Sequence, residues 1–170
     1  MYTLEDDVST LDGIIQAYYE VVSAAAGEAR DWARDSSLHA VDARVVVTGK
    51  RSDGMPFANI LTLAQYHANS GTVAKQGFFE DEIHRETQRF GNIAHVWSTY
   101  AWRRTADGPV EGRGINSIQL YHDGGSTRGS STASAKTIPY QIATCPSSAS
   151  TRHAWVCQVG AEVSSDGTLS

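Results

Sequence analysis

The chain has 170 residues, enough for one domain with a buried core. Its 41% hydrophobic and 19% charged residues are ordinary for a globular protein. A net charge of −5 excludes the basic surface that binds a phosphate backbone, so no nucleic-acid partner is expected. No apolar run reaches the ~20 residues that cross a bilayer, and the acidic N-terminus lacks signal-peptide features. We therefore expect a cytoplasmic protein with no membrane partner.

The N-terminal part of the chain predicts three helices and one strand. Residues 4–27 carry an apolar stripe at helical spacing: Val8, Leu11, Ile15, Tyr18, Tyr19 and Val22. Residues 28–38 predict a shorter helix anchored by Trp32. A β-branched run over residues 42–49 predicts a strand, and residues 50–58 have the composition of a turn. Residues 59–70 predict the third helix.

From residue 78 the pattern changes to strands. Residues 78–90 and 92–105 predict a hairpin that turns at Gly91-Asn92, and residues 112–125 predict a third strand. Helices followed by an antiparallel meander indicate an α+β fold with the helices on one face of the sheet.

The C-terminal segment, residues 126–170, differs from the domain predicted over residues 1–125. Sixteen of its 45 residues are Ser or Thr. We expect it to be flexible or to supply a late strand within residues 153–163, which include Trp155. Cys145 and Cys157 lack the spacing of a zinc site, and two unpaired thiols are favoured over a disulfide.

The stretches "GFFEDEIHRETQRFGNIAHVWSTYAWRR" and "RGINSIQLYHDGG" resemble the SnoaL-like, NTF2-like (ketosteroid-isomerase-like) superfamily, and in particular a soil mobile gene-cassette protein of that type. The resemblance covers residues 4–125. It implies a cone-shaped α+β barrel, in which three N-terminal helices wrap a curved antiparallel sheet around a pocket. Because such relatives include isomerases, cyclases, hydrolases, dehydratases and non-catalytic binders, the fold does not select a function.

The chain departs from this family at three places. After the final Asp-Gly the family continues with an Arg-Trp strand, whereas residues 126–132 are Ser/Thr-rich; a natural tail and a shifted reading frame both remain open. Ketosteroid isomerases place a catalytic aspartate five residues after the first-strand Asp, and here that position is Val47, so this activity is not expected. The family's usual His-Pro-Asp is replaced here by His39-Ala40-Val41-Asp42. His39 and Asp42 are an acid/base option, but we favour an exposed His39 beside a turn-capping Asp42.

Glu82, His84 and Glu86 alternate along the strand 78–90, so a regular strand puts them on one face. A carboxylate beside an imidazole orients it as a general base, so His84, Glu82 and Tyr100 are the predicted catalytic residues. The alternative is a solvated strand face. Which face points inward stays open, because a one-residue change at Gly91 reverses it. No metal and no cofactor are predicted.

In the next strand, Ala94, Val96, Ser98, Tyr100 and Trp102 share one side, which the resemblance turns inward. Small and aromatic residues together are typical of a wall around an apolar ligand. The predicted ligand-binding residues are these: Tyr18 (or its neighbour Tyr19), Trp32, Ser98, Trp102 and Asn116. The alternative is a solid core.

The opposite side of that strand carries Ile93, His95 and Trp97, which is too apolar for a free sheet face and predicts a homodimer. We therefore expect a protein that binds a small hydrophobic organic molecule in an interior cavity. Cofactor-independent isomerase, lyase or hydrolase chemistry is an option there. The alternative function is a non-catalytic protein-interaction module with a filled core.

Overall fold

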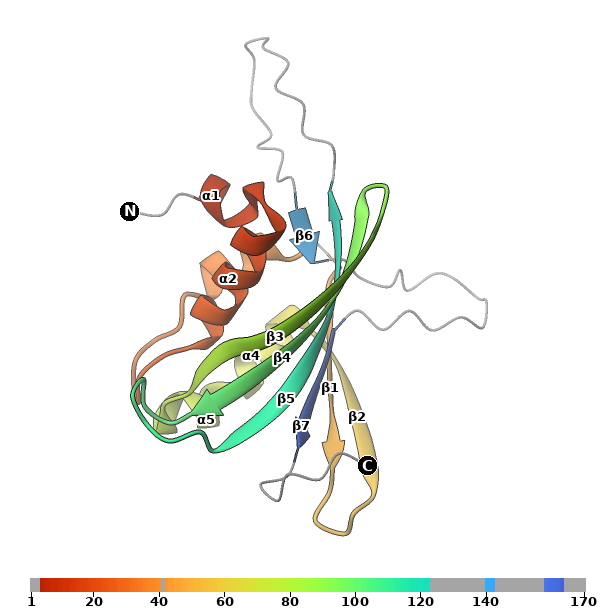
Figure 1. Cartoon of the computed structure of the whole chain (residues 1–170). Helices are drawn as coiled ribbons and strands as arrows, with labels where there is room; N and C mark the ends of the chain where they lie inside the picture. Colours follow the sequence, from red (N-terminus) through yellow and green to blue (C-terminus); the bar gives the residue numbers. More distant parts are fainter. Residues whose placement is uncertain (1–3, 41, 123–139, 143–157, 164–170) are drawn as a thin grey trace.

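The computed structural model describes residues 4–40, 42–122, 140–142 and 158–163, which form an α+β structure with helices against a curved sheet (Figure 1). The helices are α1 (Leu4–Ser9), α2 (Leu11–Val22), α3 (Trp32–Leu38), α4 (Leu63–Asn69) and α5 (Gly71–Gln76). The strands are β1 (Arg44–Lys50), β2 (Pro56–Thr62), β3 (Phe79–Phe90), β4 (Ile93–Arg103), β5 (Gly112–His122), β6 (Tyr140–Ile142) and β7 (Gln158–Val163). The predicted α+β class is confirmed.

The sheet has the strand order β2-β1-β7-β5-β4-β3, and β6 pairs with β5. β1 and β2 form an antiparallel hairpin, while β3, β4 and β5 form an antiparallel meander. β7 joins the two groups, because it runs parallel to β1 and antiparallel to β5. The described sheet ends at β2 on one side and β3 on the other, so it is open and does not close into a barrel.

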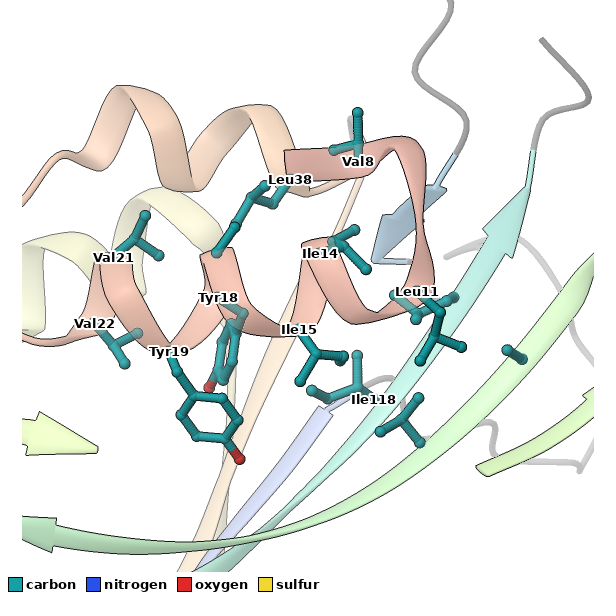
Figure 2. Packing of buried hydrophobic residues seen from close by; sticks show 14 of the residues in the cluster. Val8, Leu11, Ile14, Ile15, Tyr18, Tyr19, Val21, Val22, Leu38 and Ile118 are labelled. Carbon is teal, nitrogen blue, oxygen red and sulfur yellow. The ribbon is translucent and has the colours of Figure 1, made fainter. Parts of the chain in front are cut away.

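α2 packs its apolar face on the centre of the sheet. The predicted single helix over residues 4–27 is broken at Thr10, whose side-chain oxygen accepts a hydrogen bond from the backbone N–H of Gly13 and so caps the start of α2. Figure 2 shows Ile15 of α2 facing Ile118 of β5, and both side chains are fully buried. Burying each such side chain stabilises the fold by about 2–3 kcal/mol, so this stripe anchors α2.

The third predicted helix begins four residues later than expected. Residues 59–62 continue β2, because they pair in register with residues 44–47 of β1. The helix α4 starts at Leu63, where the Thr62 side chain accepts from the Gln65 backbone N–H and the Gln65 side chain binds the Thr62 backbone N–H. This capping box was visible in the sequence and marks the boundary.

The predicted hairpin at Gly91-Asn92 is confirmed, since Phe90 pairs with Ile93 across it. Gly91 has φ +56°, which favours glycine at this turn. In the C-terminal segment the structure describes β6 and β7, and β7 falls within the predicted late strand. The predictions for Trp155 and for the two cysteines concern residues outside the described ranges. None of the described helices has the length and apolar character needed to span a membrane.

Candidate functional site

A β-bulge decides which side chains β3 contributes to the face covered by the helices. Glu82 pairs with Tyr100 of β4, the next residue Ile83 is unpaired, and Arg85 then pairs with Ser98. The extra residue reverses the alternation of side chains along the strand. Glu82 and Arg85 therefore share the inner face of the sheet with Tyr100 and Ser98.

His84 lies on the other, solvent-facing side of the sheet. Its side chain is 65% exposed and lies 3.7 Å from a carboxylate oxygen of Glu86, which is 75% exposed. The prediction that Glu82 shares a face with His84 and Glu86 is therefore wrong, because it assumed an unbroken period of two. The structure does not bring His84 together with Glu82 and Tyr100.

On the inner face, Tyr19, Ser98 and Glu82 form a chain of hydrogen bonds beneath α2. The Tyr19 hydroxyl lies 2.7 Å from Ser98 Oγ, and the Ser98 hydroxyl donates to Glu82 Oε1. Because Ser98 gives its only proton to the carboxylate, Tyr19 is the donor to Ser98. Asn116 Nδ2 donates to the Tyr19 hydroxyl at 3.3 Å. Ser98 is 0% and Asn116 4% exposed, so these contacts replace solvent as their partners.

The ionisation of Tyr19 follows from this setting. Burial raises the pKa of Tyr19 to about 12; the hydrogen bonds with Ser98 and Asn116 oppose the increase, and the charges of Glu80 and Glu82 add to it. Tyr19 is thus a neutral hydrogen-bond donor at pH 7 and not a base.

The Arg85 guanidinium joins Glu82 to α2. Its Nε donates to Glu82 Oε1 at 2.8 Å, and its Nη1 donates to Asp12 Oδ1 at 2.5 Å. The hydrogen bonds to Glu82 are the largest cause of the raised pKa of Arg85. The Arg85 and Glu82 side chains are 21% exposed, whereas that of Asp12 is 90% exposed. The Glu82–Arg85 pair is therefore the ordered part of this ion cluster.

An open cleft of about 540 Å³ lies against this network, between α2 and the start of β3. That volume lies within the range of small-molecule sites. Ile15, Tyr19 and Phe79 give it apolar surface. Its charged lining consists of five carboxylates and one guanidinium: Asp12, Glu20, Glu80, Asp81, Glu82 and Arg85. The cleft is therefore amphipathic and mildly acidic.

Of the residues predicted to bind a ligand, Tyr19, the alternative to Tyr18, lines this cleft, and the others do not. Ser98 and Asn116 do not reach the cleft surface; both are hydrogen-bonded to Tyr19, which lines it. Tyr18 is 4% exposed and belongs to the core cluster under α2 (Figure 2), as does Tyr100 at 5%. Trp102 packs against this cluster and stacks on Phe78 with the ring centroids 5.6 Å apart. Trp32, the first residue of α3, contacts Tyr66 and His67 of α4.

Sequence reasoning did not identify Arg85 as a site residue. A Glu and an Arg three positions apart cannot share a face of a regular strand, so the pattern gave no signal for this pair. Tyr19 was named only as an alternative to Tyr18, since adjacent residues of a helix both fall within a broad apolar stripe.

A second polar cluster joins α3 to α4. The Asp35 side chain is 1% exposed, and its Oδ2 accepts a hydrogen bond from His67 Nε2 at 2.6 Å. The Trp32 indole stacks on the His67 ring with a centroid separation of 4.3 Å and an interplanar angle of 20°. His39 Nδ1 donates to the backbone oxygen of Asp35 at 2.8 Å. The expectation of an exposed His39 is wrong, because its side chain is only 3% exposed and points back to Asp35 one helical turn earlier.

Two more tyrosines, Tyr18 of α2 and Tyr66 of α4, have raised pKa values. Burial raises the pKa of Tyr18 and of Tyr66, and in both the charge of Glu80 is the next cause. The charge of Asp35 adds to the increase at Tyr66. Both hydroxyls are therefore neutral at pH 7, and the charge of Glu80, which lines the cleft, contributes to both shifts.

The described residues contain no group of three or more His, Cys, Asp or Glu side chains arranged to hold a metal ion. No protein-family model matches the chain, and no curated protein matches it. What the chain does must therefore be inferred from this geometry and from the residues that produce it.

Proposed function

We propose that the chain is a small-molecule-binding protein of the SnoaL-like, NTF2-like type, related to soil mobile gene-cassette proteins, and that the cleft between α2 and β3 holds its ligand. The order of the elements supports the family: α1 to α3 precede a strongly curved sheet and lie on one face of it (Figure 1). The cone-shaped arrangement of that family, with the pocket inside the curvature, is part of the proposal.

The observation that carries the proposal is the partly buried Glu82–Arg85 pair, held against the cleft by the bulge and by Ser98. A partly buried ion pair adds little net stability, because desolvation and screening by solvent offset the attraction between the charges. Fixed polar groups at the edge of an apolar pocket instead orient a ligand. Phe79 offers contact area to its apolar part. The ligand that fits is amphipathic, with an amine or hydroxyl group toward the carboxylates, rather than purely hydrophobic.

Native mass spectrometry of protein taken directly from cells tests this proposal. The wild-type protein should carry a co-purified small molecule, and Glu82→Gln, which keeps shape but removes charge, should lose most of it. Glu86→Gln is the matched control, because Glu86 lies on the same strand but on the outer face. Equal retention in both variants would exclude the cleft as the site.

One observation favours the alternative of a non-catalytic interaction module. Ser98, Tyr100 and Asn116, which were expected to surround a vacancy, are all buried, with exposures of 0%, 5% and 4%. A filled core at this point predicts no bound molecule in any sample, and no rise in melting temperature with amphipathic amines or alcohols. That combined result would replace ligand binding with the interaction module.

We also propose that the chain is a homodimer that pairs through the outer face of the sheet. Four apolar side chains are strongly exposed on β3 and β4: Ile83 (51%), Phe90 (83%), Ile93 (50%) and Trp97 (44%). Phe90 and Ile93 are opposite each other, so they form one patch, with His95 beside Trp97 on the same face. Light scattering should give a dimer for wild type and a monomer for Trp97→Glu. Met55→Glu, at an exposed apolar residue in the β1–β2 turn, should stay dimeric.

A further inference from the structure

The strand β2 forms one end of the sheet, and none of the strands that the structure describes pairs with its outer side (Figure 1). An open edge of this kind presents backbone N–H and C=O groups that can pair with a further strand. We propose that the edge of β2 binds an extended, uncharged segment of another protein as an added antiparallel strand. This inference goes beyond the ligand-binding cleft, and it stands or falls independently of it.

The β1–β2 turn shows which backbone groups of β2 face the open side. The Arg51 N–H donates to the Met55 oxygen at 2.9 Å, so these two residues are a hydrogen-bonded pair. Hydrogen-bonded pairs alternate along an antiparallel ladder, and the register between β1 and β2 is unbroken. The backbone groups of residues 57, 59 and 61 therefore point to β1. Those of Ala58 and Ile60 point to the open edge.

Both ends of this edge are closed, which limits strand addition to its centre. Pro56 has no N–H to donate. At the other end, the Thr62 N–H donates to Gln65 Oε1 at 2.8 Å as part of the capping box of α4. Between these ends, Ala58 and Ile60 supply two donors and two acceptors. Two partner residues that are two positions apart can satisfy all four groups.

The side chains of β2 leave this edge accessible. Ala58 and Asn59 are exposed, and Ile60 is 71% exposed. The Phe57 ring lies over β1, because Gly49 has no side chain there: a Cβ on Gly49 would be 2.9 Å from Phe57 Cε1.

The two ends of the sheet differ in charge. β2 has no charged residue. In β3, at the opposite end, six of the twelve residues are Asp, Glu or Arg, and the strand also contains the bulge. Charges and bulges are the features by which edge strands avoid pairing with other chains. Because β3 has both and β2 has neither, β2 is the edge that accepts a partner.

The size of the edge selects the kind of partner. A stable complex of two folded proteins buries about 1,600 Å². Residues 57–61 span only about 17 Å, so a second copy that met β2 alone would bury too little surface. The outer face of β3 and β4 is also the larger patch for dimerisation. A peptide added as a strand gains its affinity from main-chain hydrogen bonds and from contacts of alternate side chains.

The side chains beside the edge define which segments fit. Partner residues that hydrogen-bond with Ala58 and Ile60 lie on the same face of the sheet as these two side chains. A β-branched residue at these positions would cover part of the exposed Ile60. The partner residue between them lies opposite Asn59, whose amide can donate to or accept from a hydroxyl group. The segment that fits is therefore of the type Val-Thr-Val.

The test is an NMR titration of the ¹⁵N-labelled full chain with the peptide acetyl-Gly-Thr-Val-Thr-Val-Thr-Gly-amide. The amide signals of Ala58 and Ile60 should shift and saturate, and their hydrogen exchange should slow, because each N–H gains a carbonyl acceptor. The same peptide methylated on both valine nitrogens loses both of its ladder donors. It should bind at least about tenfold more weakly.

Ile60→Pro removes a donor on the open side and none toward β1, so this variant should fold and bind the peptide at least about tenfold more weakly. Met55→Lys is the matched control, because Met55 is an exposed apolar residue in the turn, outside the edge, and it should bind as wild type does. If Ile60→Pro does not fold, Ile60→Lys takes its place, because a charge on the edge opposes strand addition.

Unshifted Ala58 and Ile60 amides in the wild-type titration would overturn the proposal, as would shifts confined to β3. Equal affinity for the methylated and unmethylated peptides would overturn it too. If light scattering gives a dimer for wild type and a monomer for Ile60→Pro, a second copy occupies the edge and the proposal is wrong.

Discussion

Replacing Tyr19 with Phe removes one hydroxyl from the centre of the inner-face network and leaves the ring in place. The hydroxyl makes two hydrogen bonds, to Ser98 at 2.7 Å and from Asn116 at 3.3 Å. Ser98 can still donate to Glu82, but the Asn116 amide, 4% exposed, loses its acceptor. Losing two hydrogen bonds and leaving one buried amide unpaired should lower the free energy of unfolding of Tyr19→Phe by about 2–3 kcal/mol. For a chain of this size that lowers the melting temperature by about 5–10 °C.

Urea unfolding of Tyr19→Phe, Ser98→Ala and the double variant measures this directly. If the two hydroxyls interact, the double variant is less destabilised than the sum of the single variants, by about 1 kcal/mol. An unchanged urea m-value would show that the variants unfold the same structure. If the free energy of unfolding of Tyr19→Phe lies within about 0.5 kcal/mol of the wild-type value, the hydrogen bonds of Tyr19 do not stabilise the fold as argued.

The remaining predictions concern the same fold. In urea unfolding, Gly77→Ala should lower the free energy of unfolding by about 2 kcal/mol more than Gly27→Ala does. Both glycines have positive φ, but only at Gly77 would the new Cβ meet a backbone oxygen, 2.5 Å away. Equal losses for the two variants would disprove that close approach. Asp7→Asn should lower the free energy of unfolding by about 1–3 kcal/mol, because the buried Asp7 accepts hydrogen bonds from Arg34 with both oxygens at 2.8 Å and so connects α1 to α3. An unchanged melting temperature would mean that this pair does not anchor α1. Folding raises the pKa of Tyr19 from 10.0 to about 12. The neutral hydroxyl therefore contributes fully to the free energy of unfolding below pH 10, and this contribution is lost as the pH rises through about 12. Wild type should therefore lose about 3 kcal/mol more than Tyr19→Phe over that range, and parallel curves for the two proteins would contradict this.

The elements that sequence predicted well are those with a strong local pattern. The stripe of α2 and the Gly91-Asn92 turn were both predicted, because each depends on residues a few positions apart. The local alternation along β4 showed which side chains share a side, while the expectation that Ser98 and Tyr100 face inward came from the family resemblance. The prediction missed β2, whose identity depends on pairing with β1 rather than on its own composition.

By itself, the sequence determined an α+β protein with a helical N-terminal part and an antiparallel hairpin that turns at Gly91-Asn92. Only the tertiary structure decided that Arg85 and not His84 joins Glu82, because a single bulged residue reverses a strand's faces without changing its composition. It also decided the contacts Tyr19–Ser98 and Asp35–His67, whose partners are 79 and 32 residues apart in the chain. Local periodicity shows which face of an element is apolar. Which polar group a given side chain contacts depends on how the helices lie across the sheet, because the partners are distant in the sequence.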